Sequence, residues 1–406
     1  MNIEFSKLGI VLNFDMIGTL AIGLLSLYLG YYIKGKAKFL DKFGIPAAVI
    51  GGIVFALVHL VMRVGNIGAV EFNTTLLNPF MIVFFATIGL GSSVEGLKKG
   101  GKLLFFFWLL ASFMTIMQTT IGVSIAKATG INPLFGVLAG SVSMTGGHGT
   151  AGAFGQTVEA LGVSSGLSVA LASATFGLVS GGLIGAPLGF RLIKKYGLKP
   201  EELINREEIA IEENSNKRIS AESILKHVAV LGVIMTLGIT LSTFVSKKYG
   251  IALPPYVGAM FVAIIYNNLN ERLNVIEMDR NLIEIIGEVS LNVFLSMALI
   301  SLKLWELASL AVPIFLILIG QVTFMWLYTR YIVFRVMGKN YDAAVMVSGM
   351  CGFGLGATTN AMINMGEVSN KYGYTANPYL IVPLTGAFLI DMVQIPVIVT
   401  AINLFS

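Results

Sequence analysis

Apolar runs of about 20 residues recur along the whole chain, and this is the length that an α-helix needs to cross the hydrocarbon core of a bilayer. The 406 residues are 55% hydrophobic and only 12% charged, whereas soluble domains carry roughly 25% charged residues. We therefore predict an all-α polytopic membrane protein with about ten transmembrane helices. The expected spans are Phe14–Ile33, Gly44–Met62, Leu77–Leu90, Leu103–Ala126, Gly166–Phe190, Ser223–Val245, Ile251–Tyr266, Leu282–Ile300, Leu307–Tyr328 and Pro378–Asn403.

Two stretches interrupt the apolar pattern with glycine, small hydroxyl residues and amides. They are Ser141–Gln156 (SVSMTGGHGTAGAFGQ) and Ser348–Asn364 (SGMCGFGLGATTNAMIN). Glycine disfavours helix, and serine and threonine compete for backbone hydrogen bonds. Broken backbone at membrane depth persists only where protein or a water-filled cavity satisfies its polar groups. Two such segments at corresponding places in two halves indicate the binding site of a transporter.

A hydrophilic segment, residues 191–222, divides the chain into two halves of five expected spans each. It is charged and poor in aromatic residues, which is typical of a linker or surface loop. Most lysines and arginines fall on the same predicted side of the membrane as this linker, so the positive-inside rule places it in the cytoplasm and both termini outside. Because five is an odd number, the halves must insert with opposite orientation.

The two halves also share sparse identities at a constant offset of 208 residues. Pro46 matches Pro254, Gly146 matches Gly354 and Thr150 matches Thr358. This regular spacing indicates a duplicated unit. We predict a first inverted repeat at residues 1–190 with a re-entrant hairpin at about 132–156, and a second at 223–406 with a hairpin at about 342–365. These hairpins enter the membrane from opposite faces.

Re-entrant hairpins would bring the ends of short helices to the middle of the membrane. Helix N-termini present unpaired N–H groups and a partial positive charge, which suits a carboxylate. Helix C-termini and unwound carbonyls suit Na⁺, and glycine lets a ligand approach the backbone closely. The alternative is that small residues only permit tight helix packing. The recurrence of the pattern in both halves favours a site.

We predict two overlapping sets of ligands. Asp391 belongs to both sets because it is the one acidic residue well inside a predicted span, and intramembrane carboxylates usually face a cavity. His148 could donate a hydrogen bond, carry a proton or be structural, while Gln118 and Gln394 are interpreted as helix–helix contacts. The substrate-binding candidates are Ser143, Thr145, Gly146, Gly147, His148, Gly149, Gly354, Gly356, Ala357, Thr358 and Asp391, and the sodium-binding candidates are Ser141, Thr150, Thr359, Asn360 and Asp391.

Composition argues against other cofactors and partners. Cys351 is the only cysteine and the three histidines are scattered, so we expect neither a disulfide nor a resident metal. The net charge of +5 comes from residues between the spans and does not require a nucleic-acid partner. No lysine or arginine lies in the middle of an expected span, and Arg330 lies just beyond the end of the span Leu307–Tyr328. An anionic substrate would then be held by backbone N–H groups, hydroxyls and co-bound cations, which favours cation symport.

Three segments resemble the signature segments of bacterial sodium/glutamate symporters: TGGHGTAGAF at residues 145–154, MGKNYDAAV at 337–345 and CGFGLGAT at 351–358. The similarity extends over nearly the entire chain. It implies a homodimer in the lipid of the bacterial inner membrane, with two inverted repeats and paired re-entrant hairpins. It also implies Na⁺-coupled uptake of glutamate by an elevator-like movement. The glycine-rich residues of both hairpins would then form the site.

Four other functions fit parts of the pattern. A sodium-coupled transporter of another small carboxylate would share the whole architecture, and an ion channel could also be built on paired re-entrant loops. A Na⁺/H⁺ exchanger is a third possibility, but a single mid-span carboxylate gives weak support for the proton relay that it needs. A hydrolase that uses His148 and a nearby serine would need a base and an oxyanion site, and one dyad does not explain two hairpins. We therefore expect a transporter and not an enzyme.

Overall fold

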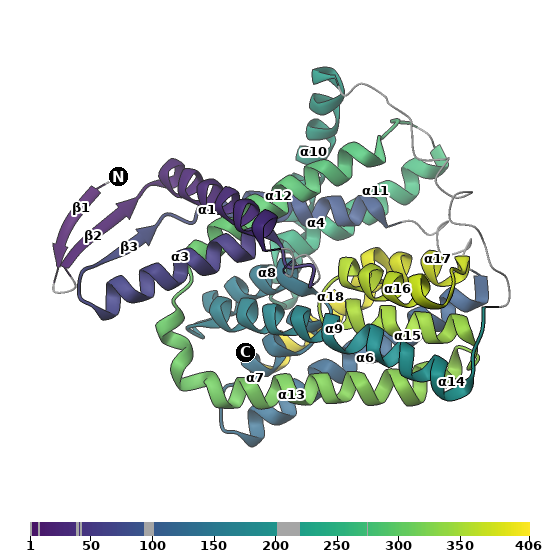
Figure 1. Ribbon diagram of the computed structural model, residues 1–406. Helices are drawn as coiled ribbons and strands as arrows, with labels where there is room; N and C mark the ends of the chain where they lie inside the picture. Colours follow the sequence, from purple (N-terminus) through teal and green to yellow (C-terminus); the bar gives the residue numbers. More distant parts are fainter. Residues whose placement is uncertain are drawn as a thin grey trace.

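The computed structural model describes residues 2–6, 9–37, 40, 43–92, 101–200, 220–273 and 275–406, and these residues are mainly helical (Figure 1). Residues 201–219 of the expected linker lie outside the described residues. In the first half, the helices are α1 (Met16–Lys36), α3 (Ala47–Val64), α4 (Leu77–Gly91), α6 (Gly101–Ala128), α7 (Pro133–Val137), the π-helix η1 (Leu138–Val142), α8 (Gly147–Ala160) and α9 (Gly166–Tyr196).

The second half begins with α10 (Ala221–Tyr249), α11 (Pro255–Leu273) and α12 (Arg280–Ile300). One long bent helix follows, made of the 3₁₀ turn η3 (Leu304–Leu310), α13 (Ala311–Tyr328), the π-helix η4 (Thr329–Val333) and α14 (Phe334–Val336). The chain ends with α15 (Tyr341–Gly354), α16 (Thr358–Tyr372), α17 (Ala376–Leu384), the π-helix η5 (Thr385–Leu389) and α18 (Asp391–Phe405).

Eight helical segments of the described chain are long and apolar enough to cross a membrane. Two expected spans are not among them: α4 has only 15 residues, and α11 ends in the polar sequence NNLNERL. The chain is thus an integral membrane protein by length and composition of its helices. The eight segments are Met16–Lys36, Ala47–Val64, Gly101–Ala128, Gly166–Tyr196, Ala221–Tyr249, Arg280–Ile300, Leu304–Val336 and Ala376–Phe405.

A small β-sheet corrects the expectation of an all-α chain. β1 (Asn2–Ser6) pairs antiparallel with β2 (Gly9–Phe14), which pairs in parallel with β3 (Gly68–Phe72). The ring of Phe14 stacks on that of Phe72, with 5.7 Å between centroids. Helix α1 begins only after Asp15, whose side chain accepts a hydrogen bond from the Gly18 amide. Phe14, expected as the first residue of a span, therefore ends a strand instead.

The helices fall into two groups that lie on opposite sides of the view in Figure 1. In the first, which we call the α4–α12 group, α1 packs on α3, α10 packs on α11, and α4 contacts both α11 and α12. In the second, the hairpin group, α6 packs on α7 and α13, while α9 contacts α8, α15 and α16. Contacts of α8 with α12 and of α4 with η5 join the two groups.

Glycine allows two helix pairs of the α4–α12 group to touch backbone to backbone. A Cβ atom added to Gly30 of α1 would lie 1.9 Å from the carbonyl oxygen of Ala47 in α3. Likewise, a Cβ on Gly238 of α10 would lie 2.3 Å from the Cα of Ala259 in α11. Small residues favour such close crossings in membranes because helices cannot rely on the hydrophobic effect to associate there.

Element boundaries repeat with the spacing seen in the sequence. Helices α3 and α11 begin 208 residues apart, as do α7 and α15. Gly30 and Gly238, at the two backbone crossings, are separated by the same 208 residues. Contacts also correspond. With α3 matched to α11 and α4 matched to α12, the packing of α3 on α12 is the counterpart of the packing of α11 on α4. The expected linker is shorter at both ends, since α9 runs to Tyr196 and α10 begins at Ala221.

Gly30→Val should lower the thermal stability of the protein, because its side chain would enter the backbone of α3. Overpacking of this kind costs about 1–3 kcal/mol. The measurement is the melting temperature of detergent-purified protein. Gly35→Val is the matched control on the same helix, since a Cβ at Gly35 meets nothing within 4 Å. Equal melting temperatures for the two variants would contradict the close crossing.

Candidate functional site

Both glycine-rich stretches contain a break in helical backbone. In the first stretch, Gly140 leaves helical geometry within η1 (φ −88°, ψ −133°). The chain turns again at Thr145 and Gly146, and α8 begins at Gly147, where φ is +61°. In the second stretch, α15 ends at Gly354 and α16 begins after Ala357, which is fully extended. Each break ends in the N-terminus of a helix.

The two breaks meet inside the protein. A Cβ atom on Gly147 would lie 2.6 Å from the carbonyl oxygen of Gly356. Gln118 of α6 joins the same two segments, because its Oε1 accepts a hydrogen bond from the Thr145 hydroxyl and its Nε2 donates to the Gly354 carbonyl, both at 2.6 Å. Segments more than 200 residues apart in sequence therefore form one buried region.

Side chains of the first stretch bind the surrounding helices. The Ser141 hydroxyl lies 2.7 Å from that of Thr119, and the Ser143 hydroxyl donates to the Ala170 carbonyl at 2.8 Å. His148 Nε2 lies 3.0 Å from the Thr175 hydroxyl. That hydroxyl donates its own hydrogen to the carbonyl of Leu171, so the imidazole N–H is the donor to Thr175. All of these side chains except Thr175 are buried.

Neighbouring candidates of the first stretch pack tightly. A Cβ on Gly146 would lie 2.5 Å from the Cβ of Thr150 and 2.7 Å from Nε2 of Gln394. A Cβ on Gly149 would lie 2.7 Å from the ring of Phe84 on α4. Substitution at either glycine would therefore displace a neighbour.

The second stretch is bound chiefly to α9. Asn360 donates from Nδ2 to the Leu178 carbonyl at 2.6 Å, and Asn364 donates to the Gly181 carbonyl at 3.0 Å. Thr358 is half-buried, whereas Thr359 is exposed. Of these candidates, Thr359 alone faces away from the buried region, so the structure does not bring it together with the others.

Three buried amide oxygens near the breaks have no hydrogen-bond partner among the described residues: Oε1 of Gln321, Oδ1 of Asn360 and Oε1 of Gln394. Their amide nitrogens are satisfied, since Gln394 donates to the Ser141 carbonyl at 2.8 Å and Gln321 donates to the Gln118 carbonyl at 2.7 Å. Buried polar atoms are nearly always paired. An unpaired amide oxygen is a hard donor that suits a cation such as Na⁺.

Asp391 begins α18, one residue after the end of the π-helix η5, and is partly buried. Its carboxylate has no hydrogen-bond or ion-pair partner among the residues that the structure describes. It lies one helical turn before Gln394, so both side chains share one face of α18. Because Gln394 binds Ser141, this face of α18 is attached to the first stretch.

Part of this arrangement could not be predicted from the sequence. Gln118 and Gln394 do form helix–helix contacts as expected, but Gln118 also joins both breaks and Gln394 keeps a free oxygen. The carbonyls of Leu178 and Gly181, which bind the second stretch, belong to an ordinary apolar span. For Gln118 and Gln394, the signal was an amide side chain within an apolar span. Every residue has a backbone carbonyl, so the roles of Leu178 and Gly181 could not be predicted from their residue type.

These features define the class of protein: an integral membrane protein whose candidate site is built from two broken helices. The sodium/glutamate symporter family matches residues 12–374. The chain is 38% identical over 390 residues to the sodium/glutamate symporter of Escherichia coli K12, covering 95% of this chain and 97% of the relative. It is 37% identical over 387 residues to that of Haemophilus influenzae, covering 94% and 96%. The chain therefore belongs to the sodium/glutamate symporter family.

A solved structure aligns with most of the chain at low similarity. The sodium proton antiporter MjNhaP1 from Methanocaldococcus jannaschii aligns with 97% of this chain and 98% of its own, with a TM-score of 0.44 and 15% sequence identity. At that similarity we draw nothing from it about this chain.

Gln118→Leu should destabilise the protein, because the Thr145 hydroxyl and the Gly354 carbonyl would lose their partner. Each buried polar group left unpaired costs about 1–3 kcal/mol. The melting temperature in detergent measures the effect. Thr120→Val is the control on the same helix, since the Thr120 hydroxyl is exposed and binds only its own helix. A Gln118→Leu protein as stable as this control would show that the bridge between the breaks contributes nothing.

Proposed function

We propose that the chain is a secondary active transporter that carries glutamate into the cell together with Na⁺. Membership of the sodium/glutamate symporter family supports the substrate and the coupling ion. The observation that carries the proposal is the meeting of two helix breaks around unpaired buried oxygens. Paired broken helices are the recurring way in which transporters bind a substrate and a cation near the middle of the bilayer.

The proposed topology has ten spans, with α4 and α11 added to the eight longer segments. The 208-residue offset between helix boundaries supports two repeats, and five spans in each require opposite orientations. The breaks then belong to re-entrant hairpins that enter from opposite faces. The distribution of lysine and arginine supports an inner-membrane protein with a cytoplasmic linker and both termini outside.

The substrate carboxylates would bind at the two helix N-termini that follow the breaks. Helix α8 begins at Gly147 and α16 begins at Thr358, and each presents free N–H groups with a partial positive charge. Gly146, Gly149, Gly354, Gly356 and Ala357 keep the backbone accessible. Ser143, Thr145 and His148 would orient the substrate or hold the walls of its site, and Asp391 would pair with the ammonium group.

Sodium would bind to the oxygens that the protein leaves unpaired. We keep Ser141, Thr150, Asn360 and Asp391 as candidates, leave out the exposed Thr359 and add Gln394. The free Oδ1 of Asn360 and Oε1 of Gln394 support this assignment. A cation at these oxygens would also offset the negative charge of glutamate, because lysine and arginine are absent from the described surroundings of the breaks.

Alternating access would proceed by an elevator-like movement of the hairpin group past the α4–α12 group. Hydrogen bonds from Asn360 and Asn364 hold the second stretch to α9, which supports movement as one body. By contrast, the first stretch meets the other group through apolar contacts, such as Gly149 against Phe84 and Gly152 against Phe294. The family resemblance supports a homodimer, and the exposed apolar faces of α1 and α10 are available to lipid or to a second copy.

Two other functions remain as alternatives to test. A sodium-coupled transporter of another small carboxylate would use the same helix N-termini and the same oxygens. A channel with paired re-entrant loops would conduct ions without coupling them to a substrate in fixed proportion. The site geometry supports neither over glutamate symport.

Purified protein in liposomes should accumulate labelled glutamate when a Na⁺ gradient is imposed and not when K⁺ replaces Na⁺. The measurement is the initial rate of uptake with and without the gradient. Uptake that is indifferent to Na⁺ would contradict symport, and accumulation of other carboxylates but not glutamate would redirect the substrate. Electrical conductance without accumulation would favour the channel.

Asp391→Asn should reduce Na⁺-driven uptake at least about tenfold, or leave uptake that no longer responds to Na⁺. Neutralising one charge that holds a cation removes roughly 1.4 kcal/mol or more of interaction, which corresponds to that factor. Glu222→Gln, which neutralises an exposed carboxylate at the start of α10, is the control and should transport normally. Full coupled activity of Asp391→Asn in well-folded protein would remove this residue from the site.

A further inference from the structure

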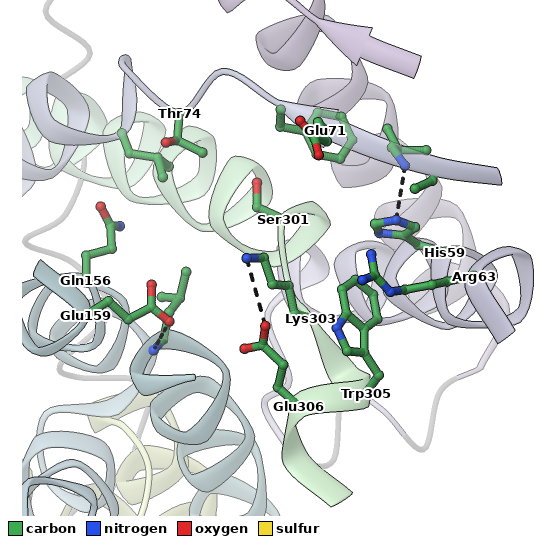
Figure 2. A pocket seen from close by; sticks show the side chains of 15 residues that line it. His59, Arg63, Glu71, Thr74, Gln156, Glu159, Ser301, Lys303, Trp305 and Glu306 are labelled. Carbon is green, nitrogen blue, oxygen red and sulfur yellow. Dashed lines mark hydrogen bonds and ion pairs between the residues drawn. The ribbon is translucent and has the colours of Figure 1, made fainter. Parts of the chain in front are cut away.

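A cavity of about 510 Å³ opens between the two helix groups, away from the helix breaks (Figure 2). Residues of α3, β3 and the start of α4 line one side, and residues of α8 and α9 line the other. Leu167, in the first turn of α9, lines the cavity, while the linker follows the last turn of this 31-residue helix. Such a helix is about 46 Å long, longer than the roughly 30 Å hydrocarbon core. The cavity therefore opens on the membrane face opposite the linker, and we call it the vestibule.

Arg63 supplies a fixed positive charge in the vestibule. Its guanidinium carbon lies 4.2 Å from the centroid of the Trp305 ring, and the ring of His59 packs against the same indole at 5.1 Å. Arg63 makes no ion pair with a carboxylate of the described chain. Stacking fixes the plane of a guanidinium but leaves its N–H groups free, which suits recognition of a carboxylate.

Two further N–H donors of the vestibule are unpaired. His59 is only 5% exposed, and its Nε2 accepts a hydrogen bond from the Val70 amide at 3.1 Å. Its proton in the neutral form is therefore on Nδ1, which is buried and has no described partner. Nε2 of Gln156 is likewise buried without a partner. Buried donors in this state are rare in folded proteins, so they indicate a ligand.

Donors and acceptors occupy both sides of the vestibule. Figure 2 shows Gln156 and Glu159 on α8 across the cavity from His59 and Arg63 on α3. One oxygen of Glu159 accepts a hydrogen bond from the Leu167 amide at 3.0 Å, and burial raises the pKa of this residue, which lies outside the eight candidate spans. Glu159 lines the same cavity as Arg63 and His59, and its second oxygen makes no hydrogen bond to the described residues.

Of the remaining charges of the vestibule, Lys303 and Glu306 offset each other. Glu306 accepts a hydrogen bond from the Ser165 hydroxyl at 2.9 Å, and its other oxygen lies 3.9 Å from the Lys303 ammonium. Glu71 is exposed at the rim. The guanidinium of Arg63 is thus the cation of the described vestibule that has no carboxylate beside it.

We propose that the vestibule is an outer binding site where an amino acid with two carboxylates rests before it reaches the helix breaks. Arg63 and His59 would take one carboxylate, Gln156 the other, and Glu159 the ammonium group. This inference rests on the proposed function, because it takes glutamate as the transported substrate. It adds a second site, with a recruiting role, on the face opposite the linker.

Arg63→Gln tests the site in cells that have no glutamate uptake of their own. We expect the KM for glutamate to rise about tenfold, the effect of losing one charge-assisted interaction of roughly 1.4 kcal/mol. Vmax per inserted molecule and the Na⁺ concentration for half-maximal rate should stay within about twofold of wild type. Arg63→Lys should give an intermediate KM, because it keeps the charge without the planar fork. Lys248→Gln, which removes an exposed cation of α10 outside the vestibule, should change nothing.

An unchanged KM in Arg63→Gln, or a loss of Vmax at unchanged KM, would overturn the vestibule site while leaving the proposed transport intact. If Arg63→Gln does not reach the membrane, the test is the KM for glutamate of Gln156→Leu, which changes the opposite side of the cavity. A KM raised at least threefold supports the site, and an unchanged KM overturns it. Absence of Na⁺-dependent uptake in the wild type would overturn the proposed function itself, and the vestibule site with it.

Discussion

The structure depends on one constraint: backbone groups released by a broken helix inside a membrane protein must find partners within the protein. The two glycine-rich stretches release such groups near one another. Gln118 binds the carbonyl at the start of the second break and the hydroxyl near the end of the first. Glycine at the contact between Gly147 and Gly356 brings the backbones close enough for this to work. A single side chain, Gln118, therefore helps to stabilise both breaks.

The helical segments could be predicted from the sequence because membrane helices leave a strong signal in hydropathy and length. Helix α3 and the expected span at Gly44–Met62, for example, differ by only a few residues. The sheet was missed because Gly9–Phe14 (GIVLNF) is short, does not alternate and runs into the apolar pattern of α1. Polar composition indicated the breaks themselves, since glycine and hydroxyl residues disfavour continuous helix.

The candidate site was only partly predictable. Side-chain chemistry pointed to Ser141, Thr145 and Asn360, and all three lie in the buried region where the breaks meet. Thr359 was chosen by the same reasoning but is exposed, because a residue's direction around a helix depends on where that helix begins. The vestibule could not be predicted, since Arg63, Gln156 and Trp305 are brought together only by the packing of α3, α8 and η3. Gln156 nevertheless ends the first glycine-rich stretch.

Helix α9 serves both stretches at once. It receives Ser143 and His148 along one part of its length and Asn360 and Asn364 along the next. A change of conformation in either stretch would therefore displace the same helix. Two ligands that bind in different halves of the chain would then be coupled through α9 without touching each other. Substitutions in the two stretches would likewise be energetically coupled rather than additive. A link of this kind, one helix bound by both halves of the chain, is what a carrier needs if two ligands are to cross only together.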